Sequence, residues 1–420
     1  MTCVFPCEVL LPVLTELFAI GAFAVMLWVM VWQAFRVCRK EQSLRRVAPF
    51  VVASAFVWSI ATLCGMYAGI NDADFNDGTI HEIEARVVAA RLLDGGFKPT
   101  EFLVVGNKGY RLLLGMFYAL TNASPWIIYG FNGMVGFTGM LLTLSSVCRY
   151  FEGRRCPVWL VVLSLLLPSC LAWAPLNLKE GMLLFGIGLI LNGVLYPPGR
   201  TRTVGSKAGL FFGSALVFFL RPHIAAAWLG GLVFGFVQPT QSVGKAISAC
   251  LAFSIVGIGA FYAIELARPG FMQGVRDEGL TGSLDASFQS RKSIGSTAIY
   301  QQSNPIPVVT GLFILALSPP PQFWGTPAWL ILGMESFVLT FLLVHGWFVR
   351  RLPSKLQLLR KPMVVGSIYV LIFLAFHLSY SYNMGLAVRQ KMMAIPAILL
   401  LISGPVLQTQ KVVRERAASG

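Results

Sequence analysis

The chain has 420 residues, of which 56% are hydrophobic and 12% are charged, and its formal net charge is +15. A soluble globular domain carries about 25% charged residues, so this composition excludes an ordinary soluble fold and indicates a polytopic membrane protein. The apolar runs are continuous rather than alternating, which disfavours a transmembrane β-barrel and predicts an all-α bundle of spanning helices.

The positive charge is concentrated on one predicted side of the membrane. More than half of the basic residues lie in the short segments Arg36–Arg46, Arg149–Arg155, Arg200–Lys207, Lys245, Arg350–Lys361 and Lys411–Arg416. Few of the 18 acidic residues fall in these segments. The positive-inside rule assigns such segments to the cytoplasmic face. We therefore expect the N-terminus outside, the C-terminus in the cytoplasm and no nucleic-acid partner.

Hydropathy predicts about eleven spans within one transmembrane domain that covers residues 1–420. In chain order they occupy residues 9–35, 48–70, 125–148, 158–174, 180–196, 208–222, 224–237, 246–266, 328–348, 362–382 and 391–408.

Two long outer loops interrupt these spans. The first, residues 71–125, contains two predicted amphipathic helices, near Gly78–Leu93 and Tyr110–Leu120. The second, residues 268–327, includes the apolar run Pro307–Ser318, which is too short to cross a bilayer and is followed by three prolines. We predict that this run is re-entrant or interfacial, a geometry that membranes tolerate only beside protein or a water-filled cavity.

The first loop is unusually acidic for so apolar a chain. It carries Asp72, Asp74 and Asp77 within a few residues, followed by His81 and Glu82. Closely spaced carboxylates repel one another, so they indicate a site that uses a cation, a proton relay or a sugar.

Structural roles are also open to these acidic-loop residues. Asp72 and Asp74 could simply cap the next helix. As a site role, the same pair could bind a divalent ion such as Mg²⁺ or Mn²⁺ through their hard carboxylate oxygens. Asp77 and His81 are four residues apart on the predicted helix and could form a solvated pair. The histidines and cysteines form no cluster that suggests zinc.

Ionisable residues recur where apolar spans reach the predicted outer face. They are Lys179, Glu180, Arg221, His223, Glu335, Arg389 and Lys391. A charge at mid-bilayer costs about 2.5–3.5 kcal/mol on insertion scales, so such residues normally face a cavity or a partner. Arg221 and Arg389 could instead reach lipid headgroups, and His223 could be structural. Their gathering on one face predicts a site shared with the acidic loop.

Carboxylates and cations on one face suit a substrate in which a lipid phosphate carries a sugar. Arginine or lysine would neutralise the leaving phosphate as its charge grows in the transition state. A carboxylate would accept the proton of the attacking hydroxyl. The candidate catalytic residues are Asp72, Asp74 and Asp77, and the candidate substrate contacts are His81, Lys179, Glu180, Arg221, His223 and Arg389.

Several short patterns resemble those of the membrane-embedded GT-C superfamily, whose members use polyprenyl-phosphate-linked donors. They are the Asp-rich loop, Asp77-Gly-Thr-Ile-His81-Glu-Ile-Glu-Ala85, Pro175-Leu-Asn-Leu-Lys179-Glu180-Gly181, Leu220-Arg221-Pro222-His223 and Asn383-Met-Gly-Leu-Ala-Val-Arg389-Gln390. The resemblance implies a GT-C-like fold, a base among the three aspartates and a phosphate site at Lys179, Arg221 and Arg389. In the best-known members the acidic loop follows the first span, whereas here it follows the second.

The resemblance implies a glycosyltransferase of the bacterial inner membrane. It would move a sugar or oligosaccharide from a polyprenyl (pyro)phosphate to a hydroxyl of a glycan or lipid acceptor, in polysaccharide or cell-envelope assembly. An O-antigen-type polymerase or ligase is the nearest alternative. Outside enzymes, the alternatives are a lipid-linked glycan flippase, which would line a path through both leaflets with charge, and a non-catalytic subunit of an envelope complex.

Overall fold

The computed structural model describes residues 7–71, 76–96, 104–121, 125–151, 155–195, 203–236, 307–349, 361–378 and 384–419, with a few isolated positions between them. Over these residues the chain forms helices and short connections and contains no strand. The predicted all-α class is therefore confirmed for this part of the chain.

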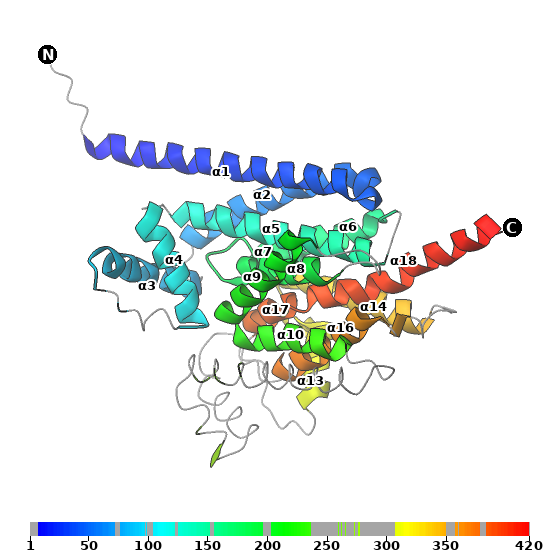
Figure 1. Ribbon diagram of the computed structural model, residues 1–420. Helices are drawn as coiled ribbons and strands as arrows, with labels where there is room; N and C mark the ends of the chain where they lie inside the picture. The colour runs from blue at the N-terminus through cyan, green and yellow to red at the C-terminus, as the bar shows by residue number, and fades with distance from the viewer. Residues whose placement is uncertain are drawn as a thin grey trace.

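The helices form one bundle, and the long helix α1 lies along one side of it (Figure 1). The α-helices are α1 Cys7–Lys40, α2 Ala48–Asn71, α3 Asn76–Leu93, α4 Asn107–Thr121, α5 Pro125–Tyr150, α6 Val158–Leu165, α7 Pro168–Trp173, α8 Glu180–Val194, α9 Val204–Leu220, α10 Pro222–Phe236, α13 Pro307–Leu317, α14 Pro327–Val344, α16 Pro362–Leu378, α17 Met384–Met392 and α18 Ile395–Ser419. The other helical segments are η1 Gln42–Val47, η3 Pro321–Phe323 and η4 His345–Val349.

Several of these helices are long and apolar enough to cross a membrane. Within the described residues four stretches qualify, namely Ile20–Lys40, Gln42–Tyr67, Pro125–Tyr150 and Pro327–Phe348. A fifth qualifies if α17 and the start of α18, which meet at a 50° bend, are one span. Shorter apolar helices of 10–17 residues lie at most of the other predicted positions, but they do not reach the length of a span, so the predicted number of eleven is not confirmed. The predicted span 246–266 lies almost entirely outside the described residues. The chain is thus a multi-pass helical membrane protein.

Glycines allow the central helices to approach closely. A Cβ atom on Gly139 of α5 would collide with the backbone of Leu184 in α8, and one on Gly188 would collide with Gly139 itself. Helices α10 and α16 meet in the same way through Gly231 and Gly366. Lipid tails are as apolar as leucine, so close packing through small residues, rather than hydrophobic burial, holds such helices together.

The two helices predicted in the first outer loop are confirmed as α3 and α4, which pack against each other. Helix α4 is amphipathic as predicted and buries Tyr110 and Leu114. The same prediction is wrong for α3. Its buried stripe consists of two small side chains and one polar side chain, Ala85, Ala89 and His81, instead of large apolar ones. Gly115 of α4 lies against the Val88 side chain and the Ala85 carbonyl of α3, so the two helices approach closely there. Other large apolar side chains of α3 remain exposed, namely Ile80, Ile83, Val87 and Leu93.

The predicted span 158–174 is broken into α6 and α7. The break falls at Leu166 and Leu167, immediately before Pro168, which cannot donate a helical hydrogen bond. The indole of Trp58 in α2 donates to the freed carbonyl of Leu165 at 2.6 Å, so the interrupted backbone is satisfied inside the protein. Beyond α7, residues 174–179 form a non-helical segment that leads into α8.

Several basic residues gather at one end of the bundle. Helices α3 and α4 lie at the end opposite to the last turn of α1 and the C-terminus (Figure 1). At the basic end, Arg149 contacts the Glu41 carboxylate at 3.5 Å and donates to Asn192 Oδ1 at 2.7 Å. Lys361 lies 5.1 Å from the ring centre of Tyr150 at that end. Arg149 and Lys361 therefore lie at the end of the bundle away from α3 and α4 (Figure 1).

Candidate functional site

A buried ion pair joins Arg221 and Glu180. Arg221 is the non-helical residue between α9 and α10, where Pro222 begins the next helix, and Glu180 is the first residue of α8. Arg221 Nη2 lies 2.6 Å from Glu180 Oε1, and the two side chains are 7% and 1% exposed. A charged pair this deeply buried has been taken out of water at a cost, so its partners must stay together.

The same pair leaves polar atoms without partners. Within the described residues, Glu180 Oε2 and Arg221 Nε are buried and make no hydrogen bond. Buried polar groups are nearly always hydrogen-bonded, so unsatisfied atoms in a native site indicate a water, an ion or a ligand group beside them. The Arg221–Glu180 pair is therefore the part of the site best prepared for a polar ligand.

A second ion pair links α3 with α17. Arg389 Nη2 lies 2.8 Å from Asp77 Oδ2 across 312 residues of sequence. The Asp77 side chain is 60% exposed, whereas that of Arg389 is only 15% exposed. The guanidinium of Arg389 also lies 5.7 Å from the ring centre of Trp173, at the end of α7. Asp77 is thus an accessible carboxylate, and Arg389 is a largely buried cation held between Asp77 and Trp173.

Partial burial raises the pKa of Asp77, but the adjacent Arg389 outweighs this effect with smaller help from His81 and Lys179. The net result is a pKa below the ordinary value for an aspartate. In this arrangement Asp77 is fully ionised at neutral pH and is a weak base as long as Arg389 holds it.

Lys179 adds a third cation between the two ion pairs. It ends the non-helical segment 174–179, is buried, and donates from Nζ to Asn107 Oδ1 at the start of α4. It interacts electrostatically with Asp77, Glu180, Arg221 and Arg389. These five residues therefore form one cluster, which we term the cation cluster, and it contains three basic side chains and two carboxylates.

A network of neutral side chains fixes the segment that carries Lys179. Asn132, in the middle of α5, donates to the carbonyls of Leu176 at 2.6 Å and Leu178 at 3.1 Å. Tyr110 of α4 donates to Asn177 Oδ1 at 3.1 Å. Several supporting residues were not predicted from the sequence, namely Asn107, Tyr110, Arg111, Asn132 and Trp173. Only Asn132 could have been recognised from the sequence, because a lone amide side chain in an apolar span usually forms hydrogen bonds to a neighbouring helix or segment.

His81 lies beside the cluster on the buried face of α3. Its Nδ1 accepts a hydrogen bond from Arg111 Nε at 3.1 Å, and its ring meets that of Tyr110 edge-on at 5.2 Å. Burial, and then the positive charges of Lys179 and Arg111, lower the pKa of His81 to about 4. The imidazole is therefore neutral at pH 7, as its acceptor role toward Arg111 requires.

Lowering the pH from 7 to 5 should destabilise the protein through His81. The pKa of His81 is about 4 in the folded protein, against 6.5 for a histidine in the unfolded chain. Between these two pH values the unfolded chain binds more protons than the folded protein, so the free energy of unfolding falls as the pH drops. The expected loss by pH 5 is about 2 kcal/mol. The measurement is the thermal unfolding midpoint in detergent, which should fall less between pH 7 and 5 in His81→Gln than in the wild type or in His345→Gln. An unchanged pH dependence in His81→Gln would contradict the assignment.

The other predicted site residues have different environments. His223 lies two residues after Arg221, beyond Pro222, and its ring stacks on His377 of α16 with centroids 4.2 Å apart. Asp72 and Asp74 lie outside the described residues, so the predicted divalent-ion site at this pair does too. Among the described residues, no group of three or more His, Cys, Asp and Glu side chains has an arrangement suited to a metal ion.

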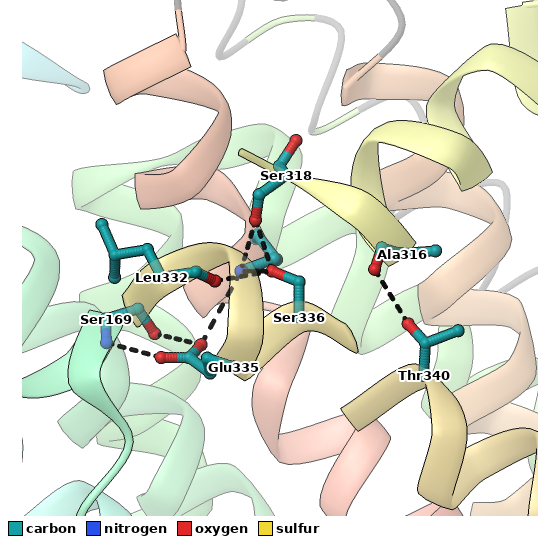
Figure 2. Close-up of polar contacts among 8 residues, drawn as sticks. Ser169, Ala316, Ser318, Leu332, Glu335, Ser336 and Thr340 are labelled. Atoms are coloured by element: carbon teal, nitrogen blue, oxygen red, sulfur yellow. Dashed lines mark hydrogen bonds and ion pairs between the residues drawn. The ribbon is translucent and has the colours of Figure 1, made fainter. Parts of the chain in front are cut away.

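A second buried polar cluster surrounds Glu335 (Figure 2), and Lys391 contacts its carboxylate. Glu335 of α14 accepts hydrogen bonds from the Ser169 backbone N–H at 2.6 Å and from Ser169 Oγ at 2.7 Å. Lys391 Nζ lies 3.7 Å from the same carboxylate, donates to the Ser318 carbonyl at 3.0 Å and also contacts Ser336 Oγ. Both side chains are 1% exposed. The charges are paired and hydrogen-bonded, which is the arrangement expected of a structural clamp.

Chemically, the cation cluster can bind an anion and offer a carboxylate beside it. Its cations come from α17, the α9–α10 junction and the segment before α8, and its accessible carboxylate comes from α3. Comparison of the chain with models of known families, with curated proteins and with solved structures finds no match.

Proposed function

We propose that the chain is an integral membrane glycosyltransferase that moves a sugar or oligosaccharide from a polyprenyl (pyro)phosphate to an acceptor hydroxyl. The observation that carries the proposal is the cation cluster, in which Lys179, Arg221 and Arg389 gather around an accessible aspartate. In an apolar bundle such charges are expensive, so they persist where a ligand uses them.

The donor phosphate would bind to the cations. The two guanidinium groups favour an anion, and they suit the bidentate contacts that phosphate oxygens offer. Arg221 Nε, which has no partner among the described residues, would donate to the phosphate. Lys179 would act as a point charge near the bridging oxygen. These contacts would strengthen as negative charge develops on the leaving group, and so would lower the barrier.

Asp77 would act as the general base. In the reaction the acceptor oxygen forms a bond to the anomeric carbon, the bond from that carbon to the phosphate oxygen breaks, and the proton of the hydroxyl passes to Asp77. Arg389 would turn from the carboxylate toward the incoming phosphate, which would restore the basicity of Asp77 only when the donor is bound. Binding and activation of the base are thereby linked through one arginine.

The finer topology belongs to the same proposal. We expect the shorter apolar helices and residues 246–266 to complete about eleven spans in a GT-C-like arrangement. The cluster would then face away from the cytosol, because Arg149, Lys361 and the basic last turn of α1 lie at the other end of the bundle (Figure 1). In a bacterium this placement corresponds to the outer face of the inner membrane.

Replacing Asp77 with asparagine should abolish transfer with little effect on stability. General-base removal typically costs 10²–10⁴-fold in rate, whereas an exposed ion pair contributes only about 0–1 kcal/mol to folding. The measurement is sugar transfer by purified protein, beside the thermal unfolding midpoint. Glu84→Gln is the matched control, because Glu84 is an exposed carboxylate on the same helix and pairs with Arg111. Equal activity in Asp77→Asn and the wild type would exclude Asp77 as the base.

The assay also separates the alternatives. Purified protein in detergent, given a polyprenyl-phosphate-linked sugar and a glycan acceptor, should release polyprenyl phosphate in proportion to product. A flippase or a non-catalytic subunit would release none under these conditions, and a flippase would instead move labelled donor across a vesicle bilayer. A product ladder that lengthens by whole repeat units would indicate a polymerase rather than a single-sugar transferase.

A further inference from the structure

A basic cavity of about 820 Å³ lies at the other end of the bundle, between the last turns of α1 and the start of α2. Its wall includes Trp32, Phe35, Arg36, Arg39, Lys40 and Arg45. Four of these are cations, and they come from two consecutive elements, α1 and η1. The proposed transferase site has no part in this cavity.

The four cations have no carboxylate to neutralise them within the described part of the chain. The acidic residue next to them in sequence, Glu41, contacts Arg149 at 3.5 Å instead. Arg36 lies 5.0 Å from the ring centre of Trp32, and Arg45 donates to the Arg39 carbonyl at 3.3 Å. The guanidinium groups of Arg36 and Arg45 are therefore held at the cavity while their charge remains uncompensated. Such a site favours an anion.

An exposed apolar stripe on α1 leads into this cavity. Val25, Trp28, Trp32 and Phe35 recur at helical spacing, and their exposed fractions are 60%, 65%, 46% and 57%. The rings of Trp28 and Trp32 stack with centroids 6.5 Å apart. Arg36 and Arg39 continue the same spacing, so one face of the helix changes from apolar to cationic within a turn. A ligand that covers this face must itself be amphiphilic.

We propose that the cavity binds the headgroup of an anionic membrane phospholipid, whose acyl chains lie along the stripe from Phe35 to Val25. Basic pockets beside spanning helices on the cytoplasmic side hold such headgroups, and tryptophan is favoured at the same membrane depth. A free phosphate would use the cations but leave the stripe uncovered. Four cations match a headgroup with two phosphodiesters better than one with a single charge.

The experiment measures lipid binding to the purified full-length protein in detergent by native mass spectrometry. The probes are tetraoleoyl cardiolipin, dioleoyl phosphatidylglycerol, dioleoyl phosphatidylcholine and inorganic pyrophosphate. The test variant is Arg39→Gln/Lys40→Gln. The control variant is Arg155→Gln/Lys207→Gln, which removes the same residue types and the same charge from exposed positions on the same predicted face but outside the cavity.

We expect cardiolipin to bind most tightly, phosphatidylglycerol next and phosphatidylcholine least. Each cation near an anionic headgroup contributes about fivefold to affinity, so the test variant should bind cardiolipin roughly 30-fold more weakly while the control stays close to the wild type. Equal losses in both variants, or no preference over phosphatidylcholine, would overturn the proposal. Pyrophosphate binding as tightly as cardiolipin would also overturn it, because the stripe would then contribute nothing.

Discussion

Replacing Arg221 with alanine should destabilise the protein by about 3–5 kcal/mol. The change leaves the Glu180 carboxylate buried without its ion-pair partner, and an uncompensated buried charge is among the most costly single-residue defects. The thermal unfolding midpoint in detergent should fall by several degrees, and transfer should be lost. Arg86→Ala is the control, because Arg86 is exposed and its pair with Glu82 is a surface pair that contributes less than 1 kcal/mol.

A double variant separates folding from function at this pair. Arg221→Met/Glu180→Leu removes both charges and keeps the volume filled, so most of the lost stability should return. Donor binding should stay lost, because the methionine cannot donate to a phosphate. Full activity in the stable double variant would show that Arg221 acts only in folding. An Arg221→Ala protein as stable as the wild type would contradict the buried ion pair itself.

Hydropathy predicted most of the helices, because long apolar helices can be recognised from composition alone. Residues 125–148 became α5 within a few positions, and residues 328–348 became α14 and η4. The break between α6 and α7 was harder to foresee, since it depends on the Trp58 indole reaching the Leu165 carbonyl from another helix. The exposed apolar face of α3 likewise follows from its close contact with α4, which no local pattern encodes.

The composition of the candidate site was predictable, but its pairing was not. Charge in an apolar chain singled out Asp77, Arg221 and Arg389, because each is costly unless it has a partner or a ligand. Nothing in the sequence indicated that Asp77 pairs with Arg389 while Arg221 pairs with Glu180. Such pairings depend on which helix ends meet, and residues 312 apart meet only in the folded bundle.

Helix α17 connects the two polar clusters of the bundle. Arg389 faces Asp77, whereas Lys391, two residues later, faces Glu335. Residues two apart on a helix point in different directions, so one short helix can be anchored on one face and present a cation on the other. The Glu335–Lys391 clamp sits next to the 50° bend between α17 and α18. It therefore sets the position from which Arg389 reaches the cation cluster.

Replacing Lys391 with methionine should consequently impair both folding and transfer. Glu335 would keep its two hydrogen bonds from Ser169 but lose its counter-charge, and a buried carboxylate without one costs about 3 kcal/mol. Transfer should fall with it, because α17 would no longer hold Arg389 near Asp77. Lys207→Met, at an exposed lysine of α9, should leave both the thermal midpoint and transfer unchanged.

A second substitution, at Glu335, tests whether the uncompensated carboxylate causes the loss of stability in Lys391→Met. Glu335→Gln in the Lys391→Met background removes the buried charge while the amide oxygen still accepts from Ser169. More than half of the lost stability should return, since the main penalty is the uncompensated carboxylate rather than the missing lysine volume. Transfer should recover alongside stability if α17 regains its position. A double variant that is less stable than Lys391→Met would mean that Glu335 is not charged in the folded protein, and the clamp would then have to be explained by hydrogen bonding alone.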